Sequence, residues 1–321
     1  MMDASIPDTM AAAVIDHYGG PEVLHLDSLP VPQPGRKQVL VRIDVAGIGV
    51  WDPYVRSGEF ELAPPHFPEV IGNDGAGTVV AVGAGVTRFH PGDQVYAFSE
   101  AGGFYAEYAA VDEDNVAPIP SGLDREMAGA LGADGLTALR GLEDQLQLEA
   151  RQTVLIFGAS GGVGHLAVQL AKRKRARVVA IASGPDGVEL VKRLGADLAV
   201  DGRQPGLARA VRDFAPEGVD AALVLAGGAE VEAALASLRP GGRIAYPNGV
   251  EPEPKAPKGI TALAYDGSPS REAFDRLNEL IGPVPFHVEL AHLYRLDEAS
   301  EAHRAIGKHH LGKLAFRVQA A

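Results

Sequence analysis

Four glycines within seven residues are the part of the chain whose spacing best fits a chemical task. The run is Gly158-Ala-Ser-Gly-Gly-Val-Gly164, which contains Ala159-x-Gly161-x-x-Gly164, a dinucleotide-binding spacing with alanine in its first place. Glycines let the backbone turn tightly and approach a pyrophosphate, whose charge lies on free N–H groups at a helix start. Because this pattern alone is a weak signal, the flanking residues decide its meaning.

The flanks of the glycine run have the required elements. Val154–Phe157 has the length and composition of a buried parallel strand, and Arg177–Ser183 is a second, β-branched strand. Between them, apolar residues recur with the spacing of one helix face. Strand, turn, helix and strand predict a dinucleotide site; the alternative is a glycine-rich turn of another doubly wound protein. The turn residues assigned to the cofactor are Gly158, Ala159, Ser160, Gly161, Gly162, Val163 and Gly164.

The rest of the chain divides into two patterns. Residues 10–123 contain short β-rich runs separated by proline and glycine turns, which predict a partly open antiparallel barrel. From Arg125 the pattern becomes helical and then alternates strands with helices, which predicts a doubly wound parallel sheet. The expected fold is therefore α/β, with one domain of residues 1–124 and 268–321 and a second of residues 125–267. Two strands of the second domain end at Ala226 and Asn248, which we also assign to the cofactor site.

Composition excludes several classes of function. A net charge of −13 argues against nucleic acid or an anionic membrane as the main partner. The chain has no cysteine, which excludes disulfides, cysteine-ligated zinc and a thiol nucleophile. It has no apolar run long enough to span a membrane and no signal-peptide pattern at its start, so we expect a cytoplasmic protein.

Several further motifs follow one another along the chain. They are Val45-Ala-Gly-Ile-Gly49, Asp52-Pro-Tyr-Val-Arg-Ser-Gly58, Gly72-Asn-Asp-Gly-Ala-Gly77, Pro91-Gly-Asp-Gln-Val95, Gly103-Phe-Tyr-Ala-Glu-Tyr108, Gly135-Leu-Thr-Ala138, Gly195-Ala-Asp197 and Gly312-Lys313. In this order they resemble the medium-chain dehydrogenase/reductase superfamily, and within it the zinc-independent quinone oxidoreductase group that includes the zeta-crystallin-like proteins. The resemblance covers nearly the whole chain and implies a GroES-like domain beside a Rossmann domain. It also implies that Thr137 lies beside the nicotinamide ribose and that Lys313 belongs to a loop near the cofactor.

The resemblance also indicates whether the protein binds a catalytic zinc ion. The positions that match the catalytic zinc ligands of related alcohol dehydrogenases are Gly49, Asn73 and Ala133, and none of these side chains replaces a thiolate or an imidazole. We therefore expect no metal. Without a Lewis acid, quinones and carbonyl-conjugated alkenes are better hydride acceptors than unactivated ketones.

Two side chains are candidates for catalysis. Tyr54 matches the family's active-site tyrosine, and its hydroxyl could orient the acceptor oxygen or relay a proton; the alternative is a structural tyrosine. Asn73 could donate a hydrogen bond to the developing oxyanion, or it could brace the glycine-rich loop. Asp134 is expected to be a helix-start or interdomain residue, and the adjacent His309 and His310 are expected at the surface.

The cofactor form depends on the end of the second strand. An NAD site usually has an acidic residue about 20 positions after the glycine turn, and here that place holds Ser183. A 2′-phosphate would meet no repulsion there, and Arg203 remains available to bind it, so we expect NADPH.

These observations predict a zinc-free oxidoreductase that transfers hydride from NADPH to a quinone or an α,β-unsaturated carbonyl. An enoyl-thioester reductase and a non-catalytic, NADPH-binding crystallin-like protein are the alternatives. By resemblance, the strand 260–265 lies at the sheet edge and pairs with its symmetry mate, so we expect a homodimer.

Overall fold

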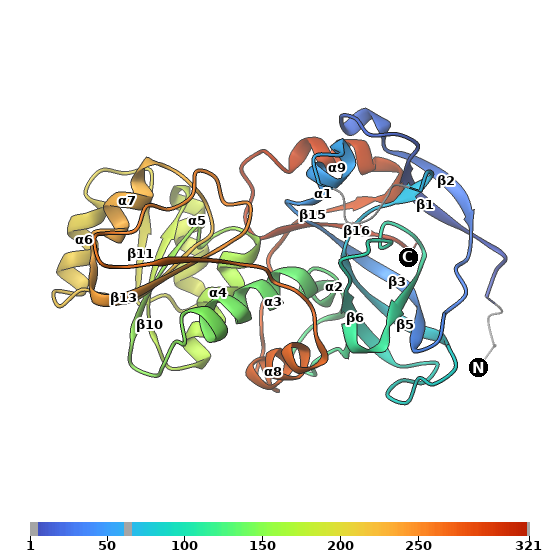
Figure 1. Cartoon of the computed structure of the whole chain (residues 1–321), viewed down its shortest axis with the longest axis horizontal. Coiled ribbons are helices and arrows are strands. Elements are labelled where there is room, and N and C mark those ends of the chain that lie inside the picture. Colours follow the sequence, from blue (N-terminus) through green and yellow to red (C-terminus); the bar gives the residue numbers. More distant parts are fainter. Residues whose placement is uncertain (1–5, 61–65, 320–321) are drawn as a thin grey trace.

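The computed structural model describes residues 6–60 and 66–319, and its two halves lie side by side (Figure 1). One half is built on a six-stranded parallel sheet in the order β11-β10-β9-β12-β13-β14. In chain order this is 3-2-1-4-5-6, the doubly wound arrangement whose ligands bind where the order reverses, here between β9 and β12. The strands are β9 Thr153–Phe157, β10 Arg177–Ala182, β11 Leu198–Asp201, β12 Val219–Val224, β13 Leu238–Pro247 and β14 Ala262–Tyr265.

Helices cover both faces of this parallel sheet. Successive residues of a strand point to opposite faces, so Val154 and Ile156 of β9 join one apolar core while Leu155 joins the other. The first core is closed by α3, α4 and α5, and the second by α6 and α7. The helices are α3 Gly132–Arg140, α4 Gly162–Arg173, α5 Gly184–Arg193, α6 Leu207–Phe214 and α7 Ala229–Leu235, preceded by the short α2 Arg125–Ala128.

The other half is mostly antiparallel. A three-stranded sheet has the order β2-β1-β4, and a seven-stranded sheet has the order β15-β16-β3-β5-β6-β8, with β7 paired to β3. Backbone hydrogen bonds of Ala11 and Ala13 with residues 105–107 join β1 to the segment before β7. The strands are β1 Thr9–Ile15, β2 His25–Pro30, β3 Gln38–Ile48, β4 Glu69–Val70, β5 Asp74–Val82, β6 Gln94–Phe98, β7 Tyr108–Asp112, β8 Val116–Pro118, β15 Leu290–Arg295 and β16 Lys313–Arg317.

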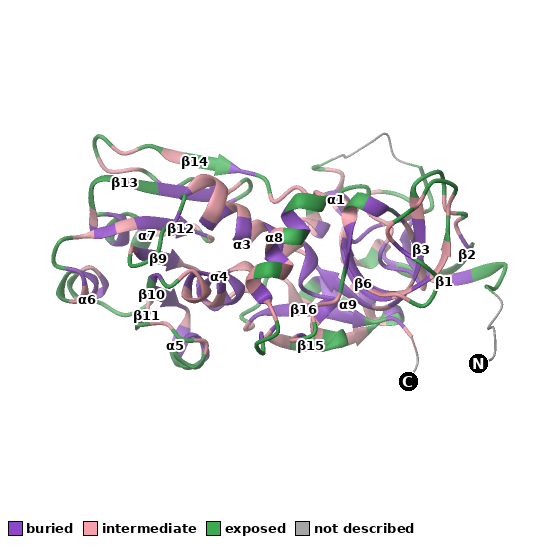
Figure 2. Ribbon diagram, turned by 90° about the horizontal axis from the view of Figure 1, so that it is seen from below, coloured by how far each residue is buried: buried purple, intermediate pink, exposed green. Residues whose placement is uncertain are grey.

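The end of the chain returns to the antiparallel half. β16 pairs antiparallel with β3, while the helices α8 Arg271–Ile281 and α9 Ala299–Ala305 lie before it. The α/β class, with one parallel sheet and one mainly antiparallel half, is as predicted. The exact domain boundaries at residues 124 and 268 stay a prediction, since α8 lies at the junction and packs on α3 and α4 of the parallel half (Figure 2).

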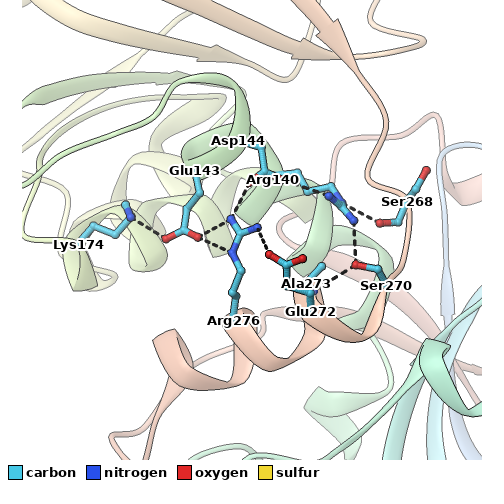
Figure 3. Close-up of polar contacts among 9 residues, drawn as sticks. All are labelled: Arg140, Glu143, Asp144, Lys174, Ser268, Ser270, Glu272, Ala273 and Arg276. Carbon is cyan, nitrogen blue, oxygen red and sulfur yellow. Dashed lines mark hydrogen bonds and ion pairs between the residues drawn. The ribbon is translucent and has the colours of Figure 1, made fainter.

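Ion pairs hold α8 at the junction (Figure 3). Arg276 of α8 donates to Glu143 at 2.6 and 3.0 Å and to Asp144 at 2.7 Å, and Lys174 lies 2.6 Å from Glu143. Burial alone would raise the pKa of Glu143, but the hydrogen bonds from Lys174 and Arg276 outweigh it and lower that pKa. Charged contacts as well as apolar packing therefore fix α8 against the parallel half.

Some elements differ from the sequence-based expectations. The predicted helix over residues 136–146 is α3 followed by a π-helical turn, Gly141–Gln145, where the Tyr265 hydroxyl lies within 2.3 Å of the place a Cβ on Gly141 would take. The strands β2 and β15 were not predicted, because most of their residues are exposed or polar. The short helix α1 Asp52–Ser57 was also missed.

Candidate active site

The glycine turn has the geometry that a dinucleotide requires. Gly158 has φ +81°, a conformation that favours glycine. A Cβ on Gly164 would lie 2.2 Å from the Gly158 carbonyl oxygen, so only glycine allows the first turn of α4 to pack on the turn. Among the described residues, no side chain caps the start of α4 at Gly161, which leaves its first N–H groups for an anion. The residues present therefore fit a pyrophosphate.

Other predicted cofactor residues lie along the same edge of the sheet. Ser183 follows β10, and its N–H donates to the buried Ser160 hydroxyl at 3.3 Å. Ala226 follows β12, and its Cβ lies 3.4 Å from where a Cβ on Gly158 would be. Asn248 follows β13, and its side-chain amide donates to Asp266 at 2.7 Å. The sheet order brings these strand ends together, as expected for one ligand edge.

The polar groups of Thr137 contact other groups of the protein. Its hydroxyl donates to the Ala133 carbonyl one helical turn earlier at 2.8 Å, and its side chain fills the space beside Gly267. Its carbonyl accepts a hydrogen bond from the Tyr265 hydroxyl at 2.9 Å. Thr137 therefore ties α3 to the end of β14, and a contact with the nicotinamide ribose stays a prediction.

A loop of the antiparallel half reaches the glycine turn. The Gly312 N–H donates to the Ser160 carbonyl at 2.8 Å, and Gly312 forms a bridge with Gly161. The buried His165 of α4 supports this contact: its Nδ1 lies 2.9 Å from the Gly161 carbonyl, and its Nε2 accepts from the Glu289 N–H at 3.0 Å. The turn is thus fixed by residues from both halves.

Lys313, assigned to the cofactor from the sequence, points into the protein instead. Its side chain is 3% exposed, and its ammonium lies 2.9 Å from Asp134 and 3.5 Å from Asp74. Burial alone would lower the pKa of Lys313, but these two carboxylates outweigh it and raise that pKa. Asp134 in turn lies against the first turn of α4, because a Cβ on Gly162 would be 2.2 Å from its Oδ2. Lys313 therefore neutralises a carboxylate that borders the expected pyrophosphate position.

An aromatic cluster of Trp51, Tyr54 and Phe60 lies on the antiparallel side of the site. The ring centroid of Trp51 is 5.5 Å from that of Tyr54 and 5.1 Å from that of Phe60. A Cβ on Gly249, next to Asn248, would be 2.7 Å from the Trp51 ring, so the cluster touches the parallel half at its ligand edge. Tyr54 is 44% exposed, and none of the residues in the described ranges hydrogen bonds to its hydroxyl. That hydroxyl is free to contact a bound molecule.

Asn73 has the bracing role that was one of its two expected roles. Its side-chain N–H groups face the Ser99 carbonyl at 2.9 Å and the Glu100 carbonyl at 3.4 Å, in the loop after β6. To donate to an acceptor oxygen, Asn73 would have to leave these carbonyls. A catalytic role of Asn73 stays a prediction.

A buried chain of hydrogen bonds, which the sequence analysis missed, supports the start of α1. Arg56 Nη1 lies 2.9 Å from His303 Nδ1, and His303 Nε2 lies 3.2 Å from the Tyr105 hydroxyl. Tyr105 donates to Asp52 at 2.5 Å, and the Gly49 N–H donates to the same carboxylate oxygen at 2.6 Å. Burial lowers the pKa of His303 to about 3 and raises the pKa of Asp52 to about 6. His303 is therefore neutral, and the chain fixes the helix that presents Trp51 and Tyr54.

The raised pKa of Asp52 predicts a pH effect on stability. An acid whose pKa rises from 3.8 to about 6 on folding stabilises the fold when protonated, and this contribution is lost as the pH rises from about 4 to about 6. Its size is about 3 kcal/mol. In Asp52→Asn this contribution is absent. The free energy of unfolding of the variant, measured in urea, should therefore rise by about 3 kcal/mol relative to that of the native protein between pH 4 and pH 7. A constant difference between the two proteins across this range would contradict the assignment.

No metal site was found in the described parts of the chain: no group of three or more His, Cys, Asp or Glu residues there could hold an ion. Gly49 and Ala133 contribute no ligand atoms from their side chains. Among the described residues there is also no helix of the length and hydropathy needed to cross a membrane.

The opposite end of the ligand edge has a contact that the sequence analysis did not anticipate. His309 lies 2.9 Å from Asp186 of α5 and 3.4 Å from Arg203. His309 is exposed, as expected, and it contacts Asp186 in the first turn of α5 and Arg203 in the loop after β11. Its neighbour His310 faces the Lys308 carbonyl instead.

Comparisons with known proteins agree with this fold. The family model for the alcohol dehydrogenase GroES-like domain matches residues 35–121, and the model for zinc-binding dehydrogenases matches residues 162–263. The quinone oxidoreductase of Sus scrofa is 32% identical over 319 residues, which cover 92% of this chain and 94% of the relative. The chain belongs to the quinone oxidoreductase group of the medium-chain dehydrogenase/reductase superfamily. It is an oxidoreductase.

Solved structures of this superfamily share the whole fold. A structure described as an NAD-dependent alcohol dehydrogenase has a TM-score of 0.87 and 31% identity, over 97% of this chain and all of that one. A mycobacterial protein complexed with NADPH has a TM-score of 0.82 and 28% identity, over 96% of this chain and 100% of that one. The two neighbours differ in the cofactor that they name, so the cofactor of this oxidoreductase must be argued from its own residues.

Proposed function

We propose that this oxidoreductase transfers a hydride from NADPH to a quinone or to an α,β-unsaturated carbonyl compound. The observation that carries the proposal is the contact of the aromatic cluster with Gly249. It puts a flat apolar surface, and a tyrosine hydroxyl without a hydrogen-bond partner among the described residues, beside the ligand edge of the parallel sheet. The name of the Sus scrofa relative and the NADPH complex of the mycobacterial neighbour support it.

Different residues of the chain would bind the cofactor and the acceptor. The glycine turn would hold the pyrophosphate, and Ser183 and Arg203 would lie on the adenosine side. Bound NADPH supplies the hydride. Trp51 and Phe60 would stack on a planar acceptor, since aromatic rings prefer offset or edge contacts at the distances seen within this cluster. The Tyr54 hydroxyl would donate a hydrogen bond to the acceptor oxygen as negative charge grows there.

Activity without zinc is part of the proposal. The positions Gly49, Asn73 and Ala133 offer one amide and no thiolate, imidazole or carboxylate. Neutral hydrogen-bond donors must then stabilise the negative charge on the acceptor oxygen. Acceptors that delocalise this charge are therefore favoured.

The test is a panel of quinones, enones, simple ketones and an enoyl thioester, with oxidation of NADPH followed by absorbance in the presence of a chelator. We expect turnover of quinones and enones, and little with ketones. Preferred turnover of the thioester would favour the enoyl-thioester alternative. NADPH binding without turnover of any acceptor would favour the crystallin-like alternative, and loss of activity with the chelator would contradict zinc-free chemistry.

A dimer is predicted from β14. This strand forms the outer edge of the parallel sheet, with Leu263 43% exposed (Figure 2). An uncovered apolar edge strand promotes pairing with another chain, and residues 260–265 of a twofold mate would continue the sheet. We expect a dimer mass by light scattering at micromolar concentration, and a shift towards monomer in Leu263→Lys. A monomer mass for the native protein would rule this interface out.

A further inference from the structure

We propose that His165 of α4 is a positioning residue for the cofactor, because its imidazole holds the glycine turn in place and ties that turn to the antiparallel half. The proposal rests on the proposed function, since it assumes that the turn binds a dinucleotide. His165 would act through the backbone of Gly161 and would not itself contact the cofactor. It follows the last glycine of the dinucleotide spacing, which does not specify the residue type at its position.

The imidazole of His165 contacts the backbone through both of its nitrogens, and its side chain is fully buried. Nδ1 lies 2.9 Å from the Gly161 carbonyl oxygen, and Nε2 lies 3.0 Å from the backbone nitrogen of Glu289, which can only donate. Nε2 must therefore be unprotonated, so Nδ1 has the proton and donates to Gly161. Burial lowers the pKa of His165 and outweighs the opposing effects of the Gly161 carbonyl and Asp134, which agrees with a neutral ring.

The Gly161 carbonyl lies at the start of α4, where it also accepts from the His165 N–H at 3.1 Å. In a planar peptide unit, the C=O of Gly161 and the N–H of Gly162 point in opposite directions. Two hydrogen bonds on that carbonyl therefore fix the direction of the Gly162 N–H. This N–H is one of the donors at the helix start that no side chain caps in the described part of the chain, so it can bind the pyrophosphate.

The second nitrogen of the ring connects the same turn to the antiparallel half. Glu289 directly precedes β15, and its carbonyl accepts from the Lys313 N–H at 2.9 Å, at the start of β16. Next to Lys313, the Gly312 N–H donates to the Ser160 carbonyl in the glycine turn at 2.8 Å. The hydrogen bonds thus form a closed circuit from the turn through His165 to the ends of two strands and back. Removal of the imidazole opens this circuit and leaves the Glu289 N–H without this acceptor.

One turn later on α4, Gln169 makes the same pair of contacts. Its Nε2 donates to the carbonyl four residues earlier, that of His165, at 3.1 Å, and its Oε1 accepts from the His287 N–H at 3.0 Å. A glutamine on this face of α4 can therefore replace both hydrogen bonds of a histidine. The two residues differ in the carbonyl that they hold, because the one held by His165 belongs to the glycine turn and the one held by Gln169 lies within the helix.

The test compares His165→Leu with the conservative variant His165→Gln and with the matched control Gln169→Leu. Dissociation constants are measured by calorimetry for NADPH, NADH and ADP-ribose, which share the pyrophosphate and differ elsewhere. We expect His165→Leu to weaken all three by a similar factor of about tenfold, because hydrogen bonds on both sides of the ring are lost. His165→Gln and Gln169→Leu should bind all three within about twofold of the native protein, since neither leaves the Gly161 carbonyl without a side-chain donor.

Steady-state kinetics with a quinone give a second measurement that a purely structural role would not move selectively. The KM for NADPH should rise in His165→Leu by about the same factor as the dissociation constant, while kcat and the KM for the quinone stay near the native values. The reason is that the imidazole acts on the glycine turn and not on the acceptor side. His165→Ala repeats both measurements with a smaller side chain, in case His165→Leu does not fold.

The outcomes separate this inference from the proposed function. Native affinity in a folded His165→Leu, unequal effects on the three ligands, or the same weakening in His165→Gln or Gln169→Leu would overturn the inference alone. Failure of both His165→Leu and His165→Ala to fold would make His165 a residue of stability only, and would also overturn it. A native protein that binds neither dinucleotide would overturn the proposed function as well. The expected pattern in a protein that reduces no acceptor would uphold the inference and overturn the proposed reaction.

Discussion

Lys313→Met is expected to lower the free energy of unfolding by about 3 to 5 kcal/mol. The ammonium of Lys313 is buried between Asp134 and Asp74, at 2.9 and 3.5 Å. Removal of one partner leaves two carboxylates without their counter-charge, and burial already raises the pKa of Asp74. Urea or thermal unfolding at neutral pH measures the loss.

Two further variants separate this effect from the loss of a lysine as such. Lys308→Met removes an exposed lysine five residues away and should leave stability nearly unchanged. Adding Asp134→Asn to Lys313→Met should restore part of the lost stability, since one unpaired charge is removed. Equal stability of Lys313→Met and the native protein would mean that the buried pair contributes no net stabilisation.

The same pair affects the cofactor site. Asp134 borders the first turn of α4, so an unpaired carboxylate there would repel a pyrophosphate. Lys313→Met should therefore weaken the binding of NADPH and of NADH by similar factors.

Local signals in the sequence predicted the parallel half well. The glycine run, the apolar strand before it and the helix face after it lie within about 30 residues, and the structure has β9, the turn, α4 and β10 at nearly the expected bounds. Such patterns depend on backbone conformation and on periodic burial, which neighbouring residues determine. The edge position of β14 was expected from the resemblance, and the sheet order agrees with it.

The functional contacts that were missed connect residues far apart in the chain. His303 meets Arg56 across 247 positions, and His309 meets Asp186 across 123. A lone histidine on a short helix or in a loop has no periodicity that marks its partner, so only the fold brings these groups together. Lys313 shows the converse: the motif placed it correctly near the glycine turn, but the direction of its side chain depends on Asp74 and Asp134, which come from other elements.

Tyr54→Phe is expected to lower turnover of an enone by about tenfold to a thousandfold, with a smaller loss for a quinone. The substitution removes only the hydroxyl, which has no hydrogen-bond partner among the described residues, and keeps the ring that packs on Trp51 at 5.5 Å. Stability and the dissociation constant of NADPH should therefore stay as in the native protein. A quinone needs less help from a donor, because its ring spreads the charge that hydride transfer creates.

Tyr294→Phe is the matched control, since Tyr294 lies on β15 away from the aromatic cluster. Initial rates of NADPH oxidation with one enone and one quinone, at saturating cofactor, give the comparison. The tyrosine would be structural if enone turnover of Tyr54→Phe equalled that of the control. An equal loss with both acceptors would instead assign the hydroxyl to a step that the two reactions share, such as binding of the acceptor. A selective loss with the enone is the result that makes Tyr54 the donor to the acceptor oxygen, because only then does the effect follow the charge that the oxygen must carry.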